Sequence, residues 1–330
     1  MEGFKKGEAS LLDTAIAIQV VLERLKVGQL KGIEDAAKNI TSVVRSQLNG
    51  MSADLKGQSK RVVSRSLARL KKSVDKTLRA YNSDVESTLK SVPGVFVGLE
   101  KEALATTIGA VTLSTPQGKK LFQSILKTPM GHSGELVADY LTALSTNESK
   151  RIVNTVTRGI YQGRTNQQIV REIVGTQSRR FKDGTLAVFR RNTTAVTFTA
   201  IQHAASVARM ELWKANADVV GSYRWVSTLD SRTTSQCRSL DGQVFEFNAG
   251  PVPPIHTRCR STTVAVLSEE FDFLSRGRTR SGEFGYVPAN QMVHGSNCAR
   301  AAAIHDGYRM VFRVVSTVSL THSLSLPACL

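Results

Sequence analysis

The sequence has little cysteine, few aromatic residues and no long apolar run. Its four cysteines are too few for a disulfide scaffold, so we expect synthesis in a reducing cytoplasm. Aromatic residues make up 6% of the chain, which suits extended helical packing better than a dense globular enzyme. The longest apolar run, near residues 103–113, is broken by Thr and Gly and is too short to span a bilayer. With no secretory signal at the N-terminus, we expect a soluble protein or one recruited to a particle.

Recognisable catalytic motifs are absent too. The chain contains no phosphate-binding loop of the Walker type, no GxSxG turn and no HExxH pair. The His-x-Glu and Pro-Cys-x-x-Cys elements of the zinc deaminases are missing as well. These absences predict a protein that is not an enzyme.

Positive charge is what the chain has in excess. Lys and Arg number 44 against 27 Asp and Glu, which gives a formal net charge of +17. This balance predicts attraction to a polyanion, whether nucleic acid, an acidic protein surface or anionic lipid. At 330 residues the chain is long enough for about two domains.

The hydrophobic pattern is mainly helical. Apolar residues recur at steps of three and four, which predicts helices at 10–26, 33–55, 58–92, 95–112, 115–127, 133–144, 148–161 and 186–215. The predicted fold class is mainly α with a small α+β module. We expect a basic helical or coiled-coil arm at 1–92, a helical bundle at 93–216, a β-rich module at 217–270 and a flexible or strand-like tail at 271–330.

Local signals mark several features of these helices. Pro93 and Gly94 predict that the 58–92 helix stops there. Thr165 and Gln168 have the spacing of a capping box. His203 lies among alanines and is predicted to be an ordinary helix residue rather than a ligand.

Five cations of the 58–92 helix fall on one side at helical spacing: Arg61, Arg65, Arg69, Lys72 and Lys76. They form either a ridge that follows a phosphate backbone or docks on an acidic surface, or the solvated face of an amphipathic helix. Interleaved aromatic residues, which would stack on bases, are missing. Any contact with double-stranded DNA is therefore expected to be non-specific.

The stretch from residue 223 to 264 differs from the helical remainder. Trp225 lies in a short strand-like run, and a β-branched run follows at 262–266. Asp241 and Gly242 look like the turn of a β-hairpin. We also expect Asp230 to bridge to Arg232, and Asp241 to pair with Arg260, from their closeness in sequence.

Cys237, His256 and Cys259 in this stretch are residue types that bind zinc. They supply three of the four ligands of a structural site; Thr234 stands where a CxxC pair would have its first cysteine, and Asp230 or water would complete the set. Two metal-free interpretations are favoured by the incomplete set: buried cysteines in a packed turn, or a Cys237–Cys259 disulfide.

The order of residues in this stretch resembles the signature of the phage minor head proteins, the Mu F-like head-morphogenesis family. The matching positions include the predicted structural motif: Trp225, Asp230, Arg232, Cys237, Asp241, Gly242, His256, Cys259 and Arg260. The resemblance implies a virion protein near the portal, with portal and capsid proteins as partners and passage with the genome at ejection. The alternative is a zinc-dependent nuclease or toxin-like enzyme that uses Cys237, His256 and Cys259.

The tail breaks in composition from everything before it. After residue 293 it contains one acidic residue and no lysine, and its strand-like run at 311–320 has no evident partner. We consider the hypothesis that the part after residue 285 arises from a shifted reading frame.

Overall fold

The structure of the protein is a computed structural model that describes residues 6–51, 59–109, 111–268 and 271. The predicted tail and its reading-frame hypothesis, apart from Phe271, lie outside these residues. The helices are α1 (Lys6–Gly28), α2 (Leu30–Asn49), α3 (Lys60–Ile108), α4 (Gly118–Lys127), α5 (Val137–Tyr161), α6 (Asn166–Val174), α7 (Thr185–Lys214) and α8 (Ser235–Leu240), with a short 3-10 turn, η2 (Gln177–Arg179). The strands are β1 (Val220–Val226), β2 (Val244–Phe245) and β3 (Thr262–Leu267).

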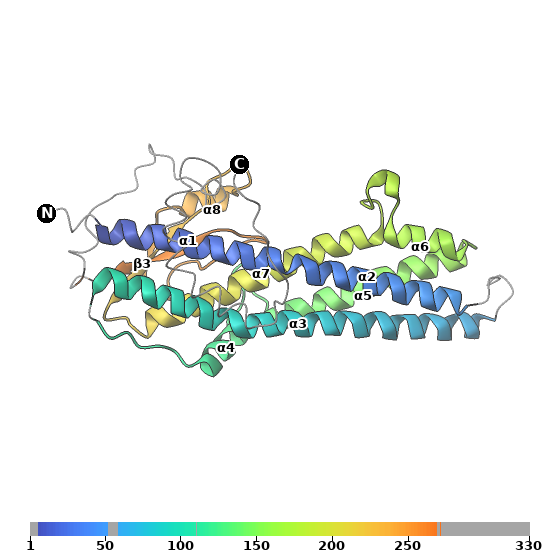
Figure 1. The fold of residues 1–330 in the computed structure, drawn as a ribbon, viewed down its shortest axis with the longest axis horizontal. Helices are drawn as coiled ribbons and strands as arrows, with labels where there is room; N and C mark the ends of the chain where they lie inside the picture. The colour runs from blue at the N-terminus through green and yellow to red at the C-terminus, as the bar shows by residue number, and fades with distance from the viewer. Residues whose placement is uncertain (1–5, 52–58, 110, 269–270, 272–330) are drawn as a thin grey trace, which may run out of the picture.

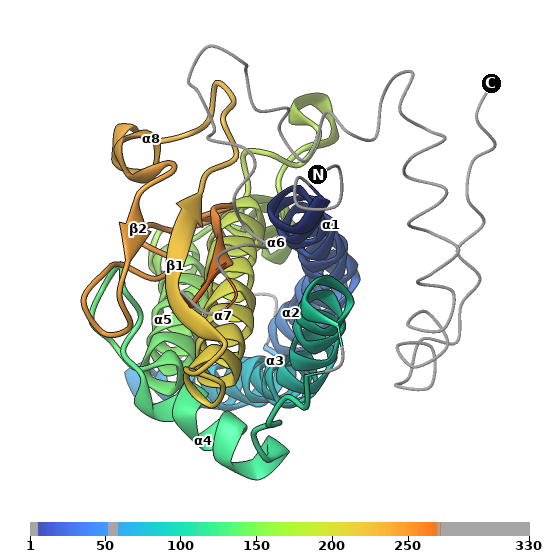
Figure 2. The ribbon, with the colours of Figure 1, turned by 90° about the vertical axis from the view of Figure 1, so that its left-hand side faces the viewer.

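The described part of the molecule is elongated. Helices α1, α2, α3, α5 and α7 run along its long axis, while the sheet and α8 lie at one end and α6 at the other (Figure 1). Viewed along that axis, the helices form a bundle with the sheet packed against one side of its near end (Figure 2). The prediction of a mainly helical chain with a small α+β module is confirmed. None of the described helices combines the length and hydropathy that crossing a bilayer requires.

Helix α7 is the centre of this arrangement. Residues 199–210 are buried on every side of the helix, and many of them are small, including Ala200, Ala204 and Ala208. A helix without an exposed face must be surrounded, and small side chains let neighbouring helices approach closely. The predicted long helix at 186–215 is thus confirmed, with α3, α5 and the sheet packed around it.

Helix α3 does not stop at Pro93, so that prediction is wrong. Its 49 residues continue to Ile108, with Pro93 buried inside the helix. A proline in a helix removes one backbone hydrogen bond, but here Val92 and Phe96 beside it are buried in the core. The predicted division of the chain at residue 92 therefore falls inside one helix, whose apolar side packs on α2, α5 and α7.

Other predicted boundaries also shift. The two helices predicted at 133–144 and 148–161 are a single helix, α5, because Glu148 and Ser149 are buried and hydrogen-bonded instead of forming a break. The helix predicted from residue 115 begins at Gly118. The capping box at the start of α6 is confirmed: Thr165 accepts from the backbone of Gln168, whose side chain accepts in return.

The sheet has the order β2-β1-β3, with both pairs antiparallel. β1 and β2 are not joined by a two-residue hairpin as predicted, because α8 lies between them. Asp241 and Gly242 instead form the turn that leaves α8. Gly242 has a φ of +80°, which favours glycine, and its N–H donates to the carbonyl of Trp225 at 2.9 Å.

Two buried polar networks join the sheet to the helices. In the first, Lys26 of α1 donates to Gln202 of α7 at 2.6 Å, and Gln202 donates to the carbonyl of Ser261 before β3. In the second, Arg209 of α7 forms an ion pair with Glu100 of α3 and donates to Thr262 of β3. Burial lowers the pKa of Lys26 and raises the pKa of Glu100. Removing one partner would leave a buried charge unpaired, so these networks fix where the sheet sits.

Candidate functional site

The residues predicted as a structural motif come together around α8 and the segment that leads into β3. A small satellite core lies there, made of Trp225, Cys237, Ile255 and Cys259. Cys237 is carried by α8, and His256 and Cys259 by the chain between the prolines and β3. The site is thus assembled from segments that are separate in sequence and meet only in the folded module.

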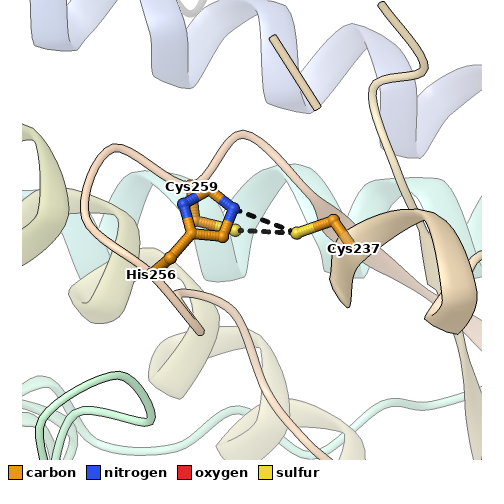
Figure 3. A group of neighbouring side chains, drawn as sticks. All are labelled: Cys237, His256 and Cys259. Carbon is orange, nitrogen blue, oxygen red and sulfur yellow. Dashed lines mark hydrogen bonds between the residues drawn. The ribbon is translucent and has the colours of Figure 1, made fainter. Parts of the chain in front are cut away.

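Three side chains converge inside this module (Figure 3). The sulfur of Cys237 lies 3.1 Å from Nε2 of His256 and 3.9 Å from the sulfur of Cys259. All three potential ligand atoms lie within 4.8 Å of one another. Both cysteines are free thiols and buried, so the disulfide considered as one alternative is not formed, while His256 is half-buried.

The three groups also shape one another's charge. The hydrogen bond with Cys259 is the largest cause that lowers the pKa of Cys237, to about 4, and His256 adds to it. The pKa of Cys259 is raised by the same neighbour and by burial. Cys237 in turn raises the pKa of His256. The three groups therefore shift one another's pKa in opposite directions, downward for Cys237 and upward for His256 and Cys259.

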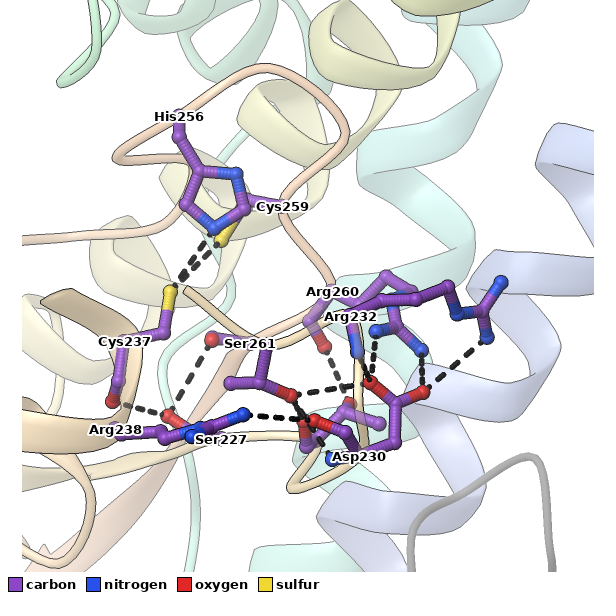
Figure 4. A network of polar contacts seen from close by, with 11 residues as sticks. Ser227, Asp230, Arg232, Cys237, Arg238, His256, Cys259, Arg260 and Ser261 are labelled. Atoms are coloured by element: carbon purple, nitrogen blue, oxygen red, sulfur yellow. Dashed lines mark hydrogen bonds and ion pairs between the residues drawn. The ribbon is translucent and has the colours of Figure 1, made fainter. Parts of the chain in front are cut away.

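Asp230 anchors the other side of the module (Figure 4). Arg260 donates to both of its carboxylate oxygens at 2.7 Å. Arg232 donates to it from its backbone N–H at 2.9 Å and from its guanidinium at 3.2 Å. Hydrogen bonds from Arg260, the largest cause, and from Arg232 hold the pKa of Asp230 well below its usual range.

The predicted bridge between Asp230 and Arg232 is confirmed, whereas the predicted pairing of Arg260 with Asp241 is wrong. Asp241 accepts instead from the backbone N–H of Ser227 at 2.8 Å. The order of β2, β1 and β3 puts the start of β3 beside the turn that contains Asp230, and sequence distance could not reveal that neighbour. Because Asp230 is engaged by two arginines, it is not a fourth ligand beside the cysteines.

Several residues of the module were not predicted. Ser227 accepts from Nε1 of Trp225 at 2.8 Å and donates to the carbonyl of Cys237 at 2.6 Å, which ties β1 to α8. Thr234 caps α8, because its side chain accepts from the backbone of Cys237. The Thr-x-x spacing before a short helix was a signal for this cap. Ser227 had no such signal, because its partners depend on the tertiary fold.

His132 is a further residue near the cluster that the sequence did not single out. Its loop packs on the proline segment, where a side chain at Gly131 would meet the carbonyl oxygens of Val252 and Pro254. Burial is the main cause that lowers its pKa, and the charge of His256 contributes. Its Nδ1 is buried and has no hydrogen-bond partner among the described residues.

The five predicted polyanion-binding residues lie far from this module. Arg61, Arg65, Arg69, Lys72 and Lys76 are all exposed on the first third of α3. Within the described part of the chain, none of the five forms an ion pair. That part of α3 is at the end of the molecule opposite to the sheet (Figure 1). His203, by contrast, is buried in α7, and its Nε2 lies 3.3 Å from the carbonyl oxygen of Ile125.

Comparison with known families gives a match in the part of the chain that contains α7, β1 and α8. Residues 150–264 match the family model described as Phage Mu protein F like protein. This region is Mu F-like. The match covers about a third of the chain and confirms the resemblance that the order of motif residues indicates. Comparison with curated proteins and with solved structures gave no match.

The Mu F-like region, residues 150–264, contains more than the predicted β-rich module. It begins inside α5, includes α6, α7, β1, α8 and β2, and ends inside β3. The cluster of Cys237, His256 and Cys259 and the anchor at Asp230 both fall within it. The cationic side of α3 lies outside it.

Proposed function

We propose that this protein is a minor structural component of a phage head that acts in head morphogenesis near the portal. The observation that carries the proposal is the match of residues 150–264 to the Mu F-like family, a range that contains α7 together with β1, α8 and β2 at its far end. In this proposal the protein resides in the virion, and its partners are portal and capsid proteins. It acts by docking and not by catalysis.

The ends of the molecule suit two different contacts. The module at one end is held rigid by the Asp230 anchor and by the two buried networks, which is what a docking surface of fixed shape requires. The other end presents the five exposed cations of α3, defined here as the α3 ridge. Their span of 15 residues along the helix corresponds to about 22 Å, enough to follow several phosphates of a duplex.

Contact between the α3 ridge and packaged DNA is the second part of the proposal. Free cations on one helix face bind phosphates without reading bases, and their affinity falls with salt. The lack of exposed aromatic residues between them agrees with non-specific binding. A protein bound to the genome in this way is also able to leave the head with it at ejection.

The nuclease alternative gains no support from the geometry. A metal-assisted nuclease needs a general base and further metal ligands that converge on one site, and Asp230 and Asp241 are the carboxylates considered for it. Asp230 is engaged by Arg260 and Arg232, and Asp241 accepts from Ser227. Among the described residues, the group around Cys237 contains no carboxylate.

Two experiments test the proposal. The tagged protein should co-purify with portal and capsid proteins from infected cells, and mass spectrometry of virions before and after ejection should show whether it leaves with the DNA. Its absence from purified virions would refute the structural role.

The α3 ridge is tested by changing Arg61, Arg65 and Arg69 together to Gln. Each phosphate contact contributes about −0.9 to the slope of log affinity against log salt. Losing three contacts should therefore make this negative slope shallower by about 3. The matched control changes three exposed lysines elsewhere, Lys119, Lys120 and Lys150, to Gln. An equal loss in the control would mean that net charge, and not the ridge, attracts DNA.

A further inference from the structure

The arrangement of Cys237, His256 and Cys259 leads beyond the proposed docking role and does not depend on it. Two thiols and one imidazole are brought together from α8 and from the chain before β3, 19 and 22 residues apart. Both sulfur atoms are buried, and the imidazole is half-buried at the surface of the module. Thiols and imidazole are the ligands that zinc prefers in proteins.

The distances between these atoms fit one tetrahedral ion. With zinc bonds of about 2.3 Å to sulfur and about 2.0 Å to nitrogen, tetrahedral ligands lie about 3.8 Å apart for two sulfurs and about 3.5 Å for sulfur and nitrogen. The observed separations are 3.9 Å between the sulfurs and 3.1 Å between Cys237 and His256. An outward movement of the imidazole by about 0.4 Å would bring its separation from Cys237 to the tetrahedral value, and all three ligand atoms lie within 4.8 Å of one another.

The imidazole is held in a suitable orientation. Nδ1 of His256 lies 3.0 Å from the carbonyl oxygen of Thr257 and donates to it, which directs Nε2 towards the two sulfurs. A backbone carbonyl on the second ring nitrogen is the arrangement that orients histidine ligands in metal sites.

We propose that Cys237, His256 and Cys259 bind one Zn²⁺ ion that cross-links the Mu F-like module, with a water molecule in the fourth position. Both sulfurs bind as thiolates and the imidazole binds neutral, so any protons that these groups carry are released to solvent on binding. The fourth position goes to water because His256 lies at the exposed side of the cluster, and Asp230 is held by Arg260 and Arg232.

The part of the chain around α8 buries little apolar surface of its own, so a bound ion would stabilise it. The cluster around α8 consists of four buried residues, two of which are the cysteines, and α8 has only six residues. Small units that bury little apolar surface are commonly stabilised by a metal or by disulfides. An ion that joins α8 to the chain before β3 closes the loop that contains β2 and the prolines, in the way that a disulfide would.

The test is metal analysis of the full-length protein purified from zinc-supplied medium and dialysed against a weak chelator. About one zinc per chain is expected in the wild type, and a large loss in Cys237→Ser, His256→Asn and Cys259→Ser. Two matched controls should keep the metal: His132→Ala, a histidine beside the cluster but outside it, and Cys298→Ser, a cysteine elsewhere in the chain.

A second measurement on the wild type applies even where a variant does not fold. Cobalt replaces zinc in such sites, and its thiolate charge-transfer absorption should appear at one ion per chain and disappear on chelation. Zinc should also protect Cys237 and Cys259, but not Cys298, from alkylation. The proposal is overturned by a zinc-free wild type whose thiols are alkylated equally with and without zinc. Zinc retained in the Cys237→Ser/Cys259→Ser double variant, or a disulfide between Cys237 and Cys259 found by peptide mass mapping, also overturns it.

Discussion

Replacing Asp230 by Asn tests how the module is held together. Asn keeps the size of the side chain and one acceptor oxygen, but it loses the charge and places an amide N–H against a guanidinium. In the folded protein Arg260 donates to both carboxylate oxygens at 2.7 Å, and the Asp230 side chain is only 10% exposed. The loss of two charge-assisted hydrogen bonds at a site partly open to water should cost about 2 to 3 kcal/mol of unfolding free energy.

The assay is urea unfolding followed by tryptophan fluorescence. The chain has two tryptophans, and Trp225 lies inside the module core. Trp213→Phe leaves Trp225 as the only reporter, and this change removes a buried indole N–H that has no partner among the described residues. In that background Asp230→Asn should lower the urea midpoint by about 1 M for a slope near 2 kcal/mol/M.

Three further results decide whether the reasoning holds. Arg232→Ala, whose side chain is 67% exposed, should cost less than about 1 kcal/mol. A double-mutant cycle with Arg260→Gln should give a coupling of at least about 1 kcal/mol. The pKa of Asp230 is lowered on folding, so its contribution is complete above the unfolded pKa of about 3.9 and is lost as pH falls further. Zero coupling, or an equal cost for Arg232→Ala, would refute the anchor.

The remaining predictions concern the helices. Burial lowers the pKa of His203 to about 4, so its contribution to stability is complete above about pH 6.5 and should fall by about 3 kcal/mol as pH drops to 4. In His203→Gln the slope of unfolding free energy against pH should be smaller over this range, and an unchanged slope would contradict this. Gly184→Ala should destabilise strongly, because its Cβ would lie 2.4 Å from the backbone nitrogen of Gly175; a melting temperature equal to that of the wild type would contradict the close contact. Thr165→Ala should cost about 1 kcal/mol by removing the cap of α6, measured by urea unfolding; a cost equal to that of the exposed Gln167→Ala control would argue against the cap.

Much of the helical fold followed from local pattern. The α7 helix, the capping box of α6 and the apolar side of α3 depend on contacts within one or two turns, which the sequence shows directly. The errors arose where distant packing overruled local signals. Pro93 remains inside α3 because its neighbours Val92 and Phe96 are buried, and α5 is continuous because Glu148 is buried against Asn192.

The sequence predicted which residues belong to the candidate site, but not all of the contacts between them. The order of motif residues brought Cys237, His256 and Cys259 to attention and indicated the family. Closeness along the chain predicted that Arg260 pairs with Asp241, whereas it pairs with Asp230. Sequence distance takes no account of the connection through α8 that separates β1 from β2. Ser227 and His132 escaped attention because their surroundings include other segments of the chain, such as α8 and the prolines before His256.

The amino-acid sequence by itself determined the helical class, the positive α3 ridge and the family resemblance, since each depends on residue type and short-range spacing. Only the tertiary structure decided which groups meet: the two thiols with one imidazole, Arg260 with Asp230, and the ridge at the end opposite to the module. The physical reason is that a charge or a ligand acts over a few ångströms in space. Whether two residues come that close depends on how the sheet packs on α7.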